Sequence, residues 1–451
     1  MKLRFLGGTG TVTGSKYLLT TRDGKVLIDC GLFQGYKELR LRNWAHPPFD
    51  AKKIDAVLLT HAHIDHSGYL PLLVKQGFQG PIYATHSTID LCSILLPDSG
   101  YLQEEDARRA NRYGYSKHHP ALPLYTEQDA LKVLKQFKLI NFETKYDVTR
   151  TMTANWYSAS HILGASFIRC EVHGKSILFT GDMGRPNDPI LYPPHPIVAS
   201  DYLVVESTYG DKIHPNEDPK IKLAEIIQNT AKRGGTILIP SFAVGRAQLI
   251  LYYLYQLKKQ KLIPDIAIYL DSPLAIEATE ILHAHVSEHR MTPKMSEDVC
   301  RIAEYVHTPE ESKVIEHNMM PKIIIAASGM ATGGRVLHHL KYYAPSHRNT
   351  ILFTGYQAGG TRGGRIMAGE RTVKIHGQEV EMNAHVEFLS NTSAHADSKE
   401  LMDWLSIIET PPKHVFITHG EQSAAQALSE KITERFGWSC SIPKYQDVET
   451  L

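Results

Sequence analysis

Cysteine is scarce in this chain and follows no pattern. The five cysteines are spread along 451 residues, and no two of them form a Cys-x-x-Cys pair. Small secreted domains depend on closely spaced, paired cysteines, so a disulfide framework is not expected here. We expect a protein of a reducing compartment, the cytoplasm.

Long apolar runs and an excess of charge of one sign are also absent. The formal net charge is +1, so a nucleic-acid site would have to be a local patch. No apolar run approaches the ~20 residues of a membrane span. The segment Met1–Gly7 does not have the pattern of a signal peptide. We expect a globular protein without a membrane partner.

The sequence lacks the motifs of nucleotide-binding loops. Gly7–Ser15 is rich in glycine, but it has neither a Gly-Lys-Ser/Thr ending nor the G-x-G-x-x-G spacing. Two β-prone segments follow it, 17–21 and 25–28, and Asp23-Gly24 between them is a strong hairpin signal. The pattern predicts a glycine-rich hairpin edge instead of a phosphate loop.

Metal-binding side chains are concentrated just after residue 60. His61, His63, Asp65 and His66 follow the apolar segment 56–59, which predicts a buried strand. They therefore lie on a loop at the carboxyl end of a strand, where α/β layers place their sites. Imidazole suits zinc, and a carboxylate can complete such a site. A surface histidine pair is the alternative for a lone His-x-His, and the longer motif disfavours it.

The same arrangement, an apolar strand followed by a polar residue, recurs along the chain. The residues in this position are Asp29, Asp182, Glu206 and His419. Taken alone, each of them is also compatible with a turn or a strand-end cap. Their repeated position favours a shared site.

The motif at His61, His63, Asp65 and His66 resembles the signature of the metallo-β-lactamase fold. Glu206, His395 within Ser393–Ser398, and His419 resemble the three markers of the β-CASP subgroup, which processes nucleic acid. The resemblance covers nearly the whole chain, and the markers occur in the order that the family has.

The resemblance implies two zinc ions per chain. One would be held by His61, His63, His161 and Asp182, and the other by Asp65, His66, Asp182 and His419. The implied catalytic residues are Asp65, His395 and Glu206. Asp29 would support the metal loop by accepting a hydrogen bond from a ligand histidine. Manganese or iron would also suit these ligands.

The expected fold class is α/β, an αββα metallo-β-lactamase sandwich with an inserted α/β β-CASP cap domain. We place the first part of the sandwich at 1–208, the cap at 209–382 and the second part at 383–451. Strands and helices alternate in the cap, which predicts a parallel sheet. Segment 384–389 is expected to return to the first domain. Helices are expected up to about residue 96, over 103–112 and over 126–137.

Three glycine loops, each with an arginine, follow strands of the expected cap, at 240–248, 327–335 and 355–365. Backbone N–H groups in such loops bind anions, and arginine adds a phosphate donor. All three resemble β-CASP motifs. The expected sugar-phosphate contacts are Ser241, Gly245, Arg246, Ser328, Gly329, Gly333, Gly334, Arg335 and Arg362. The alternative is tight turns with surface arginines.

The function implied by the resemblance is hydrolysis of single-stranded RNA by a hydroxide that two zinc ions activate. The chain is similar to the compact prokaryotic relatives of the endonuclease subunit of the cleavage and polyadenylation specificity factor. We expect an endonuclease, and 5′→3′ exonuclease activity stays open, as does a homodimer. An extra C-terminal domain and an N-terminal KH module are not expected, which puts processivity and sequence selectivity in doubt.

Three rival functions remain at this stage. One is a small-molecule ester or thioester hydrolase of the same fold, which the cap with its three loops disfavours. Another is a DNA nuclease, which is disfavoured because DNA-repair members of the family carry an apolar residue where this chain has His419. The third is a catalytically inactive RNA-binding subunit, which would be expected to have lost ligands.

Overall fold

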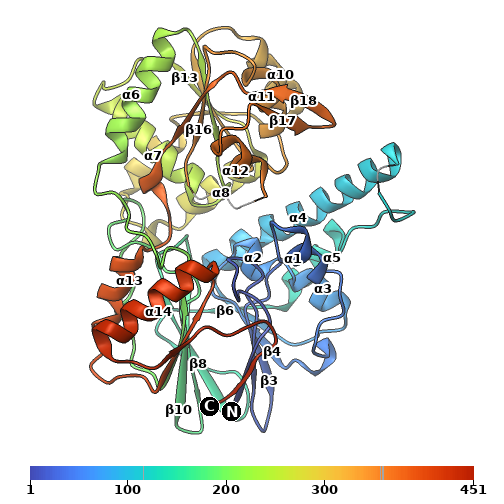
Figure 1. Ribbon diagram of the computed structural model, residues 1–451, viewed down its shortest axis with the longest axis vertical. Helices are drawn as coiled ribbons and strands as arrows, with labels where there is room; N and C mark the ends of the chain where they lie inside the picture. The colour runs from blue at the N-terminus through green and yellow to red at the C-terminus, as the bar shows by residue number, and fades with distance from the viewer. Residues whose placement is uncertain (115, 356, 358–359) are drawn as a thin grey trace. The chain divides into compact units, whose positions relative to one another are not determined.

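The chain folds into two units (Figure 1). The computed structural model describes residues 1–114, 116–355, 357 and 360–451. Unit 1 consists of Met1–Asp188, Tyr192–Ile213 and His395–Leu451, and unit 2 of Pro189–Leu191 and His214–Ala394. The domain boundaries expected at 208/209 and 382/383 stay a prediction.

Unit 1 is built around two seven-stranded sheets. In spatial order, the first contains β22 (Val448–Thr450), β1 (Lys2–Phe5), β2 (Tyr17–Thr20), β3 (Lys25–Ile28), β4 (Ala56–Leu58), β5 (Ile82–Thr85) and β6 (Phe137–Ile140). The second contains β21 (Cys440–Ser441), β20 (His414–Thr418), β11 (Tyr202–Glu206), β10 (Lys175–Phe179), β9 (Ser166–Val172), β8 (Met152–Ser158) and β7 (Lys145–Asp147). The expected hairpin is present, with Thr20 paired to Lys25.

The core of unit 1 lies between these two sheets. Strand β8 shows the underlying pattern, because Met152, Ala154 and Trp156 alternate with more exposed residues and all point into the core. The indole Nε1 of Trp156 donates to the carbonyl of Leu59 at 3.2 Å. The core therefore fixes the backbone immediately before the histidine-rich loop.

Helices cover both outer faces of the sandwich in unit 1 (Figure 1). The first sheet carries α1 (Lys37–Arg42), α2 (Ile64–Ser67), α3 (Leu70–Lys75), α4 (His86–Tyr113) and α5 (Glu127–Val133), with 3₁₀ turns at Ala51–Lys53 and Leu134–Gln136. The second carries α13 (Ser398–Leu405) and α14 (Gln422–Phe436). This is the αββα arrangement expected from the sequence, which is confirmed.

Two helix predictions differ from the structure. The helices expected before residue 96 and at 103–112 form one continuous helix, α4, with Pro97 inside it. The helix expected over 126–137 ends earlier, since residue 137 already starts strand β6. Its start is as predicted, because Thr126 and Asp129 form a capping box.

Unit 2 has a six-stranded parallel sheet, as the strand-helix alternation predicts. Its order is β14 (Glu304–Tyr305), β13 (Ala267–Leu270), β15 (Lys322–Ala326), β12 (Thr236–Pro240), β16 (Thr350–Phe353) and β19 (His385–Phe388). Its helices are α6 (Pro219–Lys232), α7 (Arg246–Lys259), α8 (Pro273–Ala284), α9 (Pro293–Cys300), α10 (Pro309–His317), α11 (Val336–Tyr343) and α12 (Arg362–Met367), with 3₁₀ turns at Val286–Glu288 and Ser390–Thr392. A hairpin joins β17 (Thr372–Ile375) and β18 (Gln378–Glu381).

Strand β19 lies in unit 2, although the sequence places 384–389 at the return to the first domain. It pairs in parallel with β16, with His385 opposite Thr350. A short strand can join any open sheet edge, and its sequence does not show which edge is free. Among the described residues, no helix is long and apolar enough to cross a membrane.

Candidate metal centre

The strand ends of unit 1 bring the histidines and carboxylates together. Strands β10, β11 and β20 are parallel neighbours, so their carboxyl ends meet at one edge of the second sheet. That edge carries Asp182, Glu206 and His419. Strands β3 and β4 are likewise parallel neighbours in the first sheet and lead to Asp29 and to the loop that begins at Thr60.

A first group of donor atoms comes from His61, His63, His161 and Asp182. His63 Nδ1 lies 3.1 Å from both His61 Nε2 and His161 Nε2. Asp182 Oδ2 lies 3.6 Å from the Nε2 atoms of His61 and His161. Ligands on a tetrahedral zinc ion, each about 2.0–2.1 Å from the metal, are roughly 3.3 Å apart. The donor set therefore fits zinc in both chemistry and spacing.

A second group consists of Asp65, His66, His419 and the other oxygen of Asp182. His66 Nε2 lies 3.2 Å from His419 Nε2 and 3.2 Å from Asp182 Oδ1. Asp65 Oδ2 lies 3.6 Å from His419 Nε2. Within the described residues, buried Asp182 Oδ1 accepts no hydrogen bond of acceptable geometry. The donor atoms of Asp65, His66 and His419 lie within 4.8 Å of one another, and Asp182 presents one oxygen to each group.

Hydrogen bonds behind the ligands fix their orientation. Buried Asp29 accepts from Thr60 N and Thr60 Oγ1, both at 2.8 Å, and lies 2.7 Å from His66 Nδ1. Thr60 Oγ1 lies 3.1 Å from His61 Nδ1, and Thr208 Oγ1 lies 3.1 Å from His419 Nδ1. Asp29 and His419 both have a left-handed backbone, with φ of 56° and 48°, which is uncommon outside glycine.

Thr60 and Thr208 were not singled out from the sequence. Each stands beside a predicted site residue, since Thr60 precedes His61 and Thr208 lies two positions after Glu206. A ligand histidine needs a hydrogen-bond partner for its second ring nitrogen. In the sequence, a hydroxyl residue close to a candidate site residue is the feature that points to such a partner.

His395 lies beside the metal centre and is held by Glu206. His395 Nδ1 is 3.1 Å from Glu206 Oε1, and its Nε2 is 4.0 Å from Asp182 Oδ2. Glu206 is buried and accepts from the backbone N–H groups of Met183 at 2.7 Å and Thr208 at 3.2 Å. An acid fixed by two backbone donors thus aims a histidine at the Asp182 carboxylate.

Burial keeps the three histidines of the first donor group neutral. It is the main cause that lowers the pKa of His63 to about 4 and the pKa values of His61 and His161 well below the ordinary value. Neutral imidazole is the form that binds metals. Burial is also the largest effect on His395 and opposes its charge, but the carboxylates of Glu206, Asp182 and Asp65 together outweigh it and raise the pKa of His395.

Comparison with known proteins identifies the relatives of this chain. Family models match in three places: the metallo-beta-lactamase superfamily at 9–89, the beta-Casp domain at 247–366, and the Zn-dependent metallo-hydrolase RNA specificity domain at 379–443. A ribonuclease of Thermus thermophilus is 34% identical, and the match covers 99% of both chains. The chain belongs to the metallo-β-lactamase-fold β-CASP family.

Other relatives of this β-CASP protein carry different names. An RNase J-like protein of Methanocaldococcus jannaschii is 31% identical, with 96% of this chain and 94% of that protein covered. A transcription termination factor, FttA, of Pyrococcus abyssi is 32% identical, with 100% of this chain and 71% of that protein covered. A crystal structure of a protein of unknown function from Enterococcus faecalis has the same fold, with a TM-score of 0.56, 13% identity and coverage of 100% and 99%.

The predicted loops of the β-CASP region meet in unit 2, at the carboxyl ends of β12, β15 and β16. Gly329 packs so closely on Phe242 that an added Cβ would lie 2.8 Å from its backbone nitrogen. Ser328 Oγ accepts from the N–H groups of Thr332 at 3.0 Å and Gly333 at 3.3 Å. Gly245 and Gly334 have positive φ, 79° and 78°. In the third loop, Tyr356, Ala358 and Gly359 lie outside the described residues.

The polar side chains of these loops make their contacts within the loops and with neighbouring segments of unit 2. Ser241 is buried and its Oγ donates to the carbonyl of Phe242 at 3.2 Å. Arg246 is buried with its guanidinium against Gly355. Arg362 donates to the carbonyls of Ala331 and Lys374. A direct contact of these residues with phosphate stays a prediction.

The Arg335 guanidinium is engaged in a hydrogen-bond network within unit 2. Its Nη1 donates to Asp271 Oδ1 at 2.6 Å, and its two terminal nitrogens also donate to the carbonyls of Val306 and His307. Asp271 has no exposed surface. The arginine expected to bind RNA thereby ties α11 to the end of β13.

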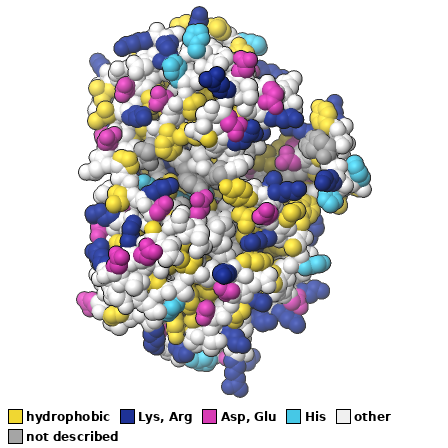
Figure 2. Space-filling model, in the orientation of Figure 1, with side chains coloured by type: hydrophobic (Ala, Val, Ile, Leu, Met, Phe, Trp, Pro, Cys, Tyr) yellow, Lys and Arg dark blue, Asp and Glu magenta, His cyan; other side chains and the backbone are white. Residues whose placement is uncertain are grey.

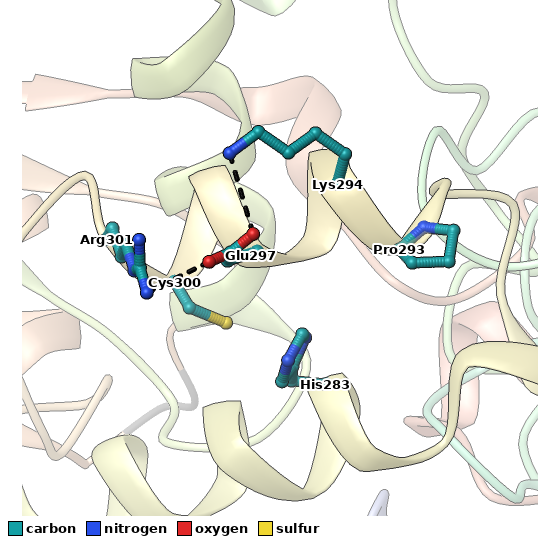
Figure 3. A pocket seen from close by; sticks show the side chains of 6 residues that line it. All are labelled: His283, Pro293, Lys294, Glu297, Cys300 and Arg301. Atoms are coloured by element: carbon teal, nitrogen blue, oxygen red, sulfur yellow. Dashed lines mark hydrogen bonds and ion pairs between the residues drawn. The ribbon is translucent and has the colours of Figure 1, made fainter.

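A hollow of about 550 Å³ in unit 2 contains none of the predicted site residues (Figure 3). Its lining comes from α8, α9 and the residue after α9, namely His283, Pro293, Lys294, Glu297, Cys300 and Arg301. Glu297 lies 3.5 Å from Lys294 and 2.9 Å from Arg301. Since these charges pair with one another, the hollow has no free charge to recognise a ligand.

We predict that Asp29→Ala weakens metal binding by about 10- to 100-fold, because the ligand loop loses the acceptor behind His66 and Thr60. Metal content after dialysis against graded chelator measures the change. Asp23→Ala, an exposed carboxylate at the turn between β2 and β3, is the matched control. Wild-type metal retention by Asp29→Ala would contradict the role.

We also predict a pH-dependent role for buried His339. Its Nε2 lies 2.6 Å from Asp271 and its Nδ1 3.2 Å from Glu316. Burial opposes charge on the imidazole, but these carboxylates outweigh it and raise the pKa of His339. The stabilisation is complete below the ordinary value of about 6.5 and fades as pH rises through the higher folded pKa.

His339→Gln should therefore lower the urea midpoint of unfolding more at about pH 6 than at about pH 8. His347→Gln, at an exposed position of the same unit, should change it little at either pH. A loss that is equal at both pH values, or larger at the higher one, contradicts the assignment.

Proposed function

We propose that this β-CASP protein is a metal-dependent ribonuclease, a hydrolase of phosphodiester bonds. The observation that carries the proposal is the shared carboxylate of Asp182 between two donor groups, with His395 and Glu206 beside it. The full-length similarity to a ribonuclease and the match to an RNA specificity domain at 379–443 support RNA as the substrate.

We assign two zinc ions to the two donor groups. The nitrogen-rich set of His61, His63 and His161 favours zinc, and the same donors also accept manganese or iron. When bound, two such cations would supply a water of lowered pKa and would neutralise charge on a phosphate. Proton transfer and the positioning of the reacting groups are assigned to amino-acid side chains.

His395 is proposed as the donor to the phosphate. Its Nε2 faces the metal centre while its Nδ1 is held by Glu206, so a proton at Nε2 can stabilise the developing negative charge or pass to the leaving oxygen. Glu206 acts through His395 and is a positioning residue. Asp65, whose side chain is 21% exposed, is proposed to orient the attacking water as well as to bind metal.

Single-stranded RNA is the proposed substrate because the three glycine loops are predicted to contact a sugar-phosphate chain. An ester or thioester hydrolase of the same fold has no need for these loops. Three further proposals rest on the sequence. They are that the protein cuts RNA internally, as an endonuclease, that it is located in the cytoplasm, and that it forms a homodimer.

His395→Ala should lower the rate of RNA cleavage by about 10²- to 10⁴-fold, because a general acid is lost, while both metal ions stay bound. The substrates are a circular and a 5′-monophosphorylated linear single-stranded RNA, and metal content is assayed alongside. His173→Ala, an exposed histidine at the turn between β9 and β10, is the control.

The outcomes separate the proposals. Cleavage of both RNAs by wild type marks an endonuclease, and cleavage of the linear RNA alone marks an end-dependent exonuclease. A wild-type protein that carries two metals and cuts neither RNA contradicts the ribonuclease, and an ester hydrolysis screen would follow.

A further inference from the structure

Unit 1 exposes a group of aromatic and basic side chains around helix α1, here called the α1 platform. It consists of Tyr36, Lys37, Arg40, Leu41, Arg42 and Trp44. Tyr36, Leu41 and Trp44 are 57%, 55% and 58% exposed. Large apolar side chains exposed together mark interaction surfaces. Hydrophobic and basic side chains are intermixed on the face of unit 1 that carries α1 (Figure 2).

Packing does not account for helix α1. None of its residues is buried, and an isolated helix this short is unstable in water. Buried Asn43 holds it in place: its Oδ1 accepts from Phe33 N at 2.9 Å, and its Nδ2 donates to Phe33 O at 2.8 Å. The fold thus fixes the backbone of a segment whose apolar side chains point to solvent.

The cations of the platform have no acidic partners. Among the described residues, Lys37, Arg40 and Arg42 form no ion pair, and Glu38 is the acidic residue of the helix. The Arg42 guanidinium stacks 4.3 Å from the ring centroid of Tyr445. A rigid surface that combines free cations with open aromatic faces has the chemistry of a single-strand nucleic-acid platform.

The segment leading to the platform is bound to the metal loop. Cys30 N donates to His66 O at 2.7 Å, and Leu32 N donates to Ile64 O at 3.0 Å. Between them, Gly31 leaves no room for a side chain, since a Cβ there would lie 1.6 Å from the carbonyl oxygen of Asp65. Helix α1 therefore follows a segment that is hydrogen-bonded to the metal loop.

We propose that the α1 platform binds single-stranded RNA next to the metal centre. Bases stack on Tyr36 and Trp44, and phosphates contact Lys37 and Arg40. The proposal rests on the proposed ribonuclease function, because it extends the path of the same substrate. Stacking on an aromatic side chain changes affinity by roughly 5- to 150-fold per base, so the platform would add substantially to the binding of long RNAs.

The test compares RNAs of about 20 and about four nucleotides, with binding measured by fluorescence anisotropy in the cleavage-impaired His395→Ala background. Tyr36→Ala with Trp44→Ala should weaken binding of the longer RNA at least about 10-fold and leave the shorter one unchanged. A variant with Trp44→Phe in place of Trp44→Ala keeps an aromatic ring and should recover much of the lost affinity for the longer RNA. Leu139→Ala, 54% exposed on edge strand β6, is the matched control.

Salt dependence tests the charged part of the platform. Lys37→Gln with Arg40→Gln should reduce the slope of log affinity against log salt by about 2, one for each phosphate contact. Because all these side chains are exposed, the variants should keep the wild-type unfolding midpoint.

The proposal is overturned if the wild type cuts RNA and both platform variants bind the longer RNA as tightly as the parent. It is also overturned if the aromatic variant changes the oligomeric mass while RNA binding stays constant, which would make the surface a protein interface. If the wild type neither cuts nor binds RNA, the ribonuclease proposal fails, and the platform proposal fails with it.

Discussion

The structure of unit 1 depends on the position of one buried carboxylate. Asp182 sends Oδ2 toward His61 and His161, and Oδ1 toward His66 at 3.2 Å and His419 at 3.3 Å. Burying this many ionisable groups together is costly unless opposite charges compensate them. Two bound cations would provide that compensation, which explains why the fold can keep such a cluster in its interior.

Parallel strands make this arrangement possible. Asp182, Glu206 and His419 come from distant parts of the sequence, but their strands are neighbours in one sheet. The loop of His61 to His66 arrives from the opposing sheet, and Trp156 links the two sheets beside it. The strained backbones of Asp29 and His419 persist because hydrogen bonds and packing hold them from several sides.

The sequence predicts the local metal motif because that motif depends on a short-range pattern, whereas the αββα fold class followed from the family resemblance. His61 to His66 stand in one loop after an apolar strand. His161 and His395 became site candidates through resemblance, since no local pattern separates them from structural histidines. The choice of sheet edge by β19 and the internal partners of Arg335 and Arg362 depend on tertiary contacts. For the same reason, the hydroxyls of Thr60 and Thr208 emerged only from the structure.

The most direct test of the shared carboxylate is the metal content of the wild type and of Asp182→Asn, measured by elemental analysis of the folded proteins. The account predicts two ions per wild-type chain. It predicts that the variant loses affinity at both positions together, because Asp182 serves both donor groups. Loss of a single ion, with the other bound as tightly as in the wild type, would contradict the shared carboxylate.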